Sequence, residues 1–109
     1  MTAPGPLSAW LRARTPVPPP QLVARLDAMT TAIASEEASA DVLLAAAERA
    51  MGGLLRDGCL TRGAALDLLA VDALVTYAFE AAADDPEQLE DCAARALARI
   101  SVLAEPYRE

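Results

Sequence analysis

The segment from Ala64 to Ala83 is the feature that most constrains the fold of this chain. Within its twenty residues the strongly polar side chains are Asp67 and three residues spaced by four, namely Asp72, Thr76 and Glu80. On a helix this spacing forms one narrow polar stripe and leaves the other faces apolar. Such a helix must be covered by its own chain or by a partner. The sequence therefore predicts an all-α fold, a small antiparallel bundle of about four helices, which we expect to be oligomeric.

The composition agrees with a helical bundle that is short of large core residues. The chain has 109 residues, of which 26 are Ala and 4% are aromatic. Its length predicts a single domain. Ala is the best helix former but buries little apolar area, so close helix approach or a subunit interface must supply stability. Runs of Val, Ile and Thr are absent from the sequence, which argues against a sheet.

Several classes of function are disfavoured by the ionisable residues. The chain has no His, which excludes His-based catalysis and His-ligated metals. Its net charge of −7 repels phosphate, so we expect neither nucleic-acid binding nor binding to anionic membranes. No base is placed to activate a Ser, Thr, Cys or Tyr, and no Gly-rich phosphate loop is present. We therefore predict a protein that is not an enzyme, with no catalytic residues and no cofactor.

Residues 1–20 are predicted to form a Pro-rich basic arm, since they hold six of the eight prolines. A short helical turn is expected from Leu7 to Arg12, and it contains the only Trp of the chain. Trp is costly to leave in water, so the arm should dock on its own body, on a neighbouring subunit or on another protein. Residues 1–25 carry three Arg and no acid, whereas the remainder carries −10. The predicted interaction arm comprises Leu7, Trp10, Leu11, Arg12 and Arg14.

Residues 21–105 are predicted to form the bundle, followed by a tail at 106–109. The first helix should begin near Pro19 or Pro20, where Pro is tolerated in the first turn. Its apolar seam comprises Leu22, Leu26, Met29 and Ile33. Ser39 should cap a second helix that runs to about Asp57, with Gly58 as its C-terminal cap.

The last two helices have their own start signals. Thr61 is expected to cap the apolar helix, and Asp85 followed by Pro86 to begin the fourth helix, with Gln88 completing a capping box. We expect an outward Asp91–Arg95 pair on that helix. Its bundle-facing seam is predicted to comprise Leu89, Ala93, Ala96, Ile100 and Leu103.

Two glycines inside the second helix, Gly52 and Gly53, require a reason because they lower helix propensity. We expect close backbone contact with another helix. The alternative is a small apolar ligand between the second and third helices, with Asp72 and Thr76 as polar contacts. Its predicted lining comprises Met51, Gly52, Gly53, Tyr77 and Phe79.

The carboxylates are not expected to bind metal. A cluster of six acids around the start of the last helix lacks EF-hand spacing, and four of them sit where a helix N-terminus favours acids in any case. That cluster comprises Glu80, Asp84, Asp85, Glu87, Glu90 and Asp91. Asp67 and Asp72 do not share a helix face, and each should pair with an Arg, such as Arg49, Arg56 or Arg62, or face water.

One short segment has a local resemblance. Residues 69–80, LAVDALVTYAFE, resemble the GDALLxxAFE helix of trans-polyprenyl diphosphate synthases, which helps to wall an isoprenoid-binding bundle. The likeness covers about twelve residues. The two DDxxD motifs of that family and its phosphate-binding lysines are absent here, so the resemblance implies no such activity.

We therefore predict a subunit that associates with itself or with another protein through its apolar third helix and its arm. An apolar-ligand-binding bundle is the alternative. The first ten residues do not have the pattern of a signal peptide, which predicts a cytoplasmic protein with Cys59 and Cys92 reduced. Asp67 and Asp72 argue against a membrane span of the apolar helix.

Overall fold

The prediction of an all-α protein is confirmed by a computed structural model, which describes residues 5–57, 61–83 and 85–107. The α-helices are α1 (Leu7–Arg12), α2 (Pro20–Thr30), α3 (Ala40–Asp57), α4 (Arg62–Ala82) and α5 (Pro86–Ala104). Two 3-10 turns, Thr31–Ile33 and Glu105–Tyr107, follow α2 and α5. None of the described helices is long and apolar enough to cross a membrane.

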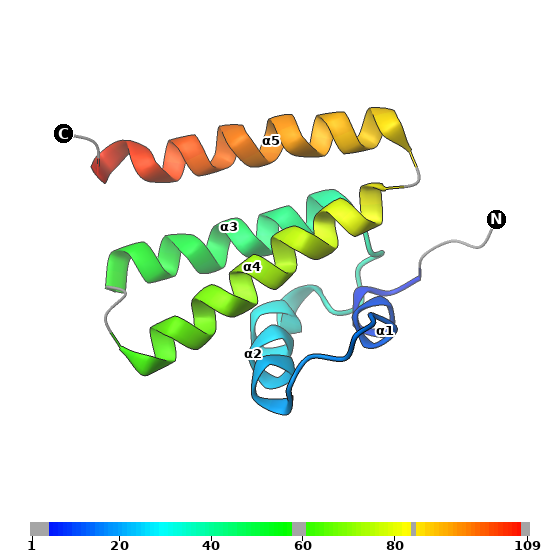
Figure 1. Cartoon of the computed structure of the whole chain (residues 1–109), viewed down its shortest axis with the longest axis horizontal. Coiled ribbons are helices and arrows are strands. Elements are labelled where there is room, and N and C mark those ends of the chain that lie inside the picture. Colours follow the sequence, from blue (N-terminus) through cyan, green and yellow to red (C-terminus); the bar gives the residue numbers. More distant parts are fainter. Residues whose placement is uncertain (1–4, 58–60, 84, 108–109) are drawn as a thin grey trace.

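Helices α3, α4 and α5 run in alternating directions along the long axis of the molecule, and α1 and α2 lie together against one side (Figure 1). The closest packing is between α3 and α4. Small residues allow this approach, because Ala46 and Ala47 of α3 and Ala70 and Ala78 of α4 are all buried. Leu43 of α3 and Leu74 of α4 are fully buried as well. Extensive Ala thus serves close helix contact, as the composition predicts.

Local sequence signals set the helix starts. The Thr61 hydroxyl accepts from the amide of Ala64 at 3.0 Å, and the Ser39 hydroxyl accepts from the amide of Val42 at 3.2 Å. An oxygen of Asp85 accepts from the amide of Glu87 at 3.0 Å, and Pro86 occupies the first helical position. These three predicted caps are confirmed. The predicted cap Gly58 lies outside the described residues.

The first predicted helix ends earlier than its apolar seam. The α-helix stops at Thr30, and Ile33 reaches the core from the 3-10 turn instead. The hydroxyls of Thr30 and Thr31 donate to the carbonyls of Leu26 and Asp27 at 2.8 and 2.7 Å. Back-bonding by adjacent β-branched residues disfavours continuation of the helix. Ile33 is therefore buried, but not as part of a straight seam.

The fourth predicted helix forms, but its seam is only partly covered. Cys92 and Ala96 are the buried residues of α5, whereas Leu89 is 37% and Ile100 54% exposed. The expected Asp91–Arg95 pair is replaced by an ion pair from Arg95 to α3. Helix α5 is thus rotated so that its Arg-bearing edge faces the bundle, and part of its apolar seam faces outward.

Candidate functional site

The N-terminal arm docks on its own chain. The amide of Leu7 donates to the carbonyl of Glu36 at 2.7 Å, and the amide of Ala38 donates to the carbonyl of Gly5 at 2.9 Å. Leu7 is fully buried. The arm therefore joins the α2–α3 connection through backbone bonds and an apolar anchor, which is the first of the three docking alternatives raised by the sequence.

Aromatic and charged contacts join the arm to α4. The rings of Trp10 and Tyr77 meet edge to face, with centroids 6.1 Å apart. The guanidinium of Arg14 stacks 3.7 Å from the Trp10 ring centroid and pairs with Glu80 at 3.6 Å. The pKa of Tyr77 is raised by burial and by the Glu80 charge, while Arg14 opposes this. Of the predicted arm residues, Leu11 also packs on the core and Arg12 is exposed.

The predicted polar stripe of α4 is exposed at Asp72, Thr76 and Glu80. The Thr76 hydroxyl donates to the carbonyl of Asp72 at 3.0 Å. Glu80 contacts the arm, whereas Asp72 borders a groove on another side of α4. The stripe is therefore divided between two environments and does not form one site.

The main apolar concavity lies between α3, α4 and α5 and has a volume of about 380 Å³. We call it the three-helix groove. Asp72, Glu48 and Arg99 supply its polar lining, and the rest is apolar. The apolar lining comprises Leu44, Ala47 and Met51 of α3, Leu68, Val71 and Val75 of α4, and Ala96, Ile100 and Leu103 of α5.

The groove differs from the predicted ligand site in position and lining. Of the residues expected there, Met51 and Asp72 line it. Tyr77 instead faces the arm, and Phe79 packs against the core. Gly53 borders a separate polar pocket of about 470 Å³ between α2, α3 and α4. Ala96, Ile100 and Leu103 of α5 also line the groove, whereas the sequence placed these residues in the seam of the fourth helix and not in the ligand site.

The close backbone contact expected at Gly52 and Gly53 is not found: among the described residues, only side chains lie near a Cβ built at either position. A Cβ built at Gly52 would lie 3.4 Å from Nη1 of Arg56 and 3.7 Å from Cδ2 of Leu103, and one at Gly53 would lie 3.9 Å from Nη2 of Arg56. These are ordinary contacts with side chains. The helix therefore has space for Ala at Gly53.

We expect Gly53→Ala to raise the free energy of unfolding by about 1 kcal/mol, because Ala has the higher helix propensity. Chemical denaturation followed by circular dichroism measures the change. Gly5→Ala is the matched control, since Gly5 has a φ of 78° that L side chains rarely adopt. This second change should destabilise by about 1 kcal/mol. A loss of stability in Gly53→Ala would contradict the expectation.

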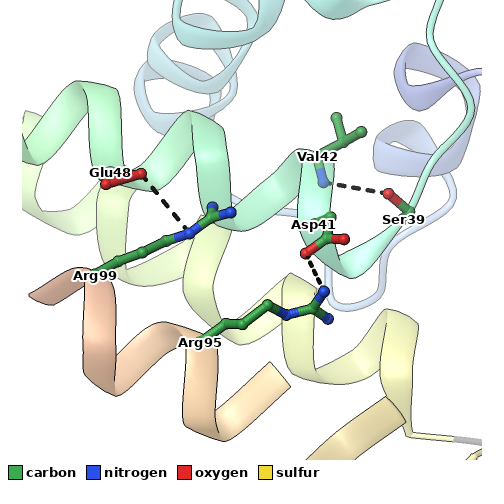
Figure 2. A network of polar contacts seen from close by, with 6 residues as sticks. All are labelled: Ser39, Asp41, Val42, Glu48, Arg95 and Arg99. Atoms are coloured by element: carbon green, nitrogen blue, oxygen red, sulfur yellow. Dashed lines mark hydrogen bonds and ion pairs between the residues drawn. The ribbon is translucent and has the colours of Figure 1, made fainter. Parts of the chain in front are cut away.

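Two ion pairs join α5 to α3 (Figure 2). Arg95 pairs with Asp41 at 2.7 Å, and Arg99 with Glu48 at 3.8 Å. The Nε of Arg95 and the Nη1 of Arg99 are buried without a hydrogen-bond partner among the described residues. Cys92 lies buried on the same helix, and burial raises the pKa of its thiol, with Arg95 opposing and Asp41 reinforcing. The two ion pairs hold the α5 arginines toward α3.

The two aspartates of α4 considered from sequence, Asp67 and Asp72, lie in different environments. Asp67 pairs with Arg25 of α2 at 2.7 Å, rather than with the arginines considered from sequence. Asp72 is exposed, as the water-facing alternative requires. No cluster of three or more metal-ligating side chains occurs within the described ranges. Asp84 and Cys59 lie outside them.

Among its described lining residues, the three-helix groove has charged side chains but no nucleophile beside a base. The groove is therefore an apolar concavity with exposed apolar residues at its edge. Comparison with known protein families, curated proteins and solved structures finds no match to this chain.

Proposed function

We propose that this protein is a non-enzymatic helical subunit that binds a protein partner through α4 and α5. The observation that carries this proposal is the uncovered apolar edge of the three-helix groove. Leu68 and Ile100 line the groove and are 37% and 54% exposed, and Leu97, one turn from Ile100 on α5, is 70% exposed. Contiguous apolar surface of this kind is characteristic of interaction sites. We call these three residues the α4–α5 surface.

The proposal retains the apolar helix anticipated from sequence and adds α5. Leu7 and Trp10 of the arm already make contacts within the chain, so the arm supports the fold in this proposal. The acidic body bears on the choice of partner, since a net charge of −7 disfavours nucleic acid. A protein with a complementary apolar face is the partner class that this surface fits.

The groove also favours a second candidate function, the binding of a small apolar ligand. Its volume of about 380 Å³ and its mostly aliphatic lining lie within the range of small-molecule sites. The two proposals differ in what occupies the groove. A protein partner covers the α4–α5 surface from outside, whereas a ligand inserts between the helices.

Photocrosslinking in the native host separates these proposals. A photoreactive residue at position 97 should yield a covalent protein adduct, whereas the same residue at Asp27, exposed on α2, should not. The crosslinked partner should bind the purified protein, and Leu97→Glu should weaken that binding about tenfold or more, because a charge is poorly accommodated in an apolar contact. Native mass spectrometry reports any retained small molecule.

The outcomes are distinct. An adduct specific to position 97, with binding sensitive to Leu97→Glu, supports the subunit proposal. The absence of any adduct contradicts it. A reproducible small-molecule mass that Val75→Trp displaces would favour the ligand proposal, because the larger side chain would fill the groove.

A further inference from the structure

One face of α5, beside the three-helix groove, carries a row of exposed apolar residues. In Figure 1, α5 runs along the side opposite α1 and α2. The row consists of Leu89, Ala93, Leu97, Ile100 and Ala104, all of them exposed. This spacing is that of a helix surface that packs against another helix. On the basis of the proposed function, we propose that the partner is a second copy of this chain, whose α5 packs antiparallel to that of the first.

The sizes of the residues in this row are self-complementary. In an antiparallel pair with its twofold axis beside Leu97, Ala93 of one copy faces Ile100 of the other, and Leu89 faces Ala104. The two Leu97 side chains meet near the axis. We call each set of facing residues a layer. The layers on either side of the axis thus combine one large and one small residue, which allows the side chains to interdigitate. Because the interface is twofold, each such contact occurs twice.

The charges of α5 favour the antiparallel direction over the parallel one. Glu87, Glu90 and Asp91 are clustered in the first turns of α5, and all three are exposed. A parallel pair would bring the two acidic clusters together, whereas an antiparallel pair places them at opposite ends of the interface. The helix dipoles are also opposed in the antiparallel pair. Arg95 and Arg99 remain paired with α3 in either case.

The expected dimer is weak, because a pair of single helices covers less surface than a standard interface. Helix α5 has 19 residues and is therefore about 28 Å long. Leu68 of α4 lines the same groove as Ile100 and would extend the contact beyond α5. We expect a dissociation constant in the micromolar range, about 1 to 100 µM.

Sedimentation equilibrium of the purified full chain over a concentration series tests this arrangement through a residue exchange. Ile100→Ala leaves Ala facing Ala, and Ala93→Ile places Ile against Ile. Each single change should weaken dimerisation about tenfold or more. The double variant A93I/I100A restores one large and one small residue in each layer, and should recover binding to within about threefold of the original chain. Circular dichroism establishes that each variant keeps its helical fold.

Ala98→Ile is the matched control, because position 98 is exposed on α5 but lies off the row. It should leave the dissociation constant unchanged. A double variant that binds no better than Ile100→Ala would overturn the antiparallel arrangement. A chain that stays monomeric throughout the series would overturn the second copy as partner, and a crosslink from position 97 to a different protein would then show that the proposed function survives. The absence of both dimer and crosslink would overturn both.

Discussion

We expect Leu74→Ala to lower the free energy of unfolding by about 2–5 kcal/mol, toward the upper end of that range. Leu74 is fully buried on α4. One turn away on either side, Ala70 and Ala78 are also fully buried, and their methyl groups cannot extend to fill the space that the change creates. The cost of such a substitution rises with the residual cavity. Urea denaturation followed by circular dichroism measures the change.

Leu69→Ala provides the control on the same helix. Leu69 is 58% exposed, so its truncation should alter the free energy of unfolding by about 0.5 kcal/mol or less. The two variants share the same chemistry and differ in burial. Equal losses of stability would mean that Leu74 does not occupy the close-packed centre between α3 and α4.

The parts of the fold that sequence could predict are those decided within one or two helical turns. Thr61, Asp85 and Pro86 mark helix starts because the cap and the amides that it accepts from are neighbours in the chain. The exposed stripe of α4 is predictable for a similar reason, since it follows from helical periodicity alone. Burial of Ile33 was also predictable, although the two Thr hydroxyls that end α2 before it compete with the helix locally.

The rotation of α5 could not be predicted because it depends on residues distant in the chain. The sequence pattern of α5 predicts one apolar seam. The seam alone does not specify how far the helix is rotated about its own axis relative to the bundle. Arg95 meets Asp41, and Arg99 meets Glu48, both on α3. Such partly exposed pairs contribute only about 0–1 kcal/mol each, but they select between packing arrangements of similar burial. The resulting arrangement leaves Leu97 and Ile100 uncovered.

The three-helix groove was missed for the same reason. Its lining comes from three helices, and its position depends on how α5 lies over α3 and α4. The sequence predicted Met51 and Asp72 beside a ligand, and both residues line the groove. It placed Tyr77 there as well, but Tyr77 is drawn to Trp10 by the docked arm. Charge alone could not predict which body the arm docks on, because a basic arm is attracted to an acidic body in the same chain and to one in a partner.

Leu7→Ala should detach the arm from the body and move the Trp10 fluorescence maximum to longer wavelength. Leu7 is fully buried, and it is the apolar anchor between the backbone hydrogen bond to Glu36 and the Trp10–Tyr77 contact. Removal of a buried Leu side chain costs about 2–5 kcal/mol where the structure cannot adjust. Here the arm can separate, so the loss of stability is limited by the free energy with which the arm docks. Trp10 is the only Trp of the chain, which makes its emission a specific measure of this contact.

Arg12→Ala is the control for Leu7→Ala on the same short helix. Arg12 lies on the same short helix but is exposed, so its loss should leave the Trp10 emission unchanged and alter stability by about 0.5 kcal/mol or less. Hydrogen exchange should show faster exchange at the amides of Leu7 and Ala38 in Leu7→Ala alone, because these amides donate across the arm contact. If Arg12→Ala instead produced the larger red shift, attraction between the basic arm and the acidic body would be what holds the arm. The burial of Leu7 would then be a consequence of docking and not its cause.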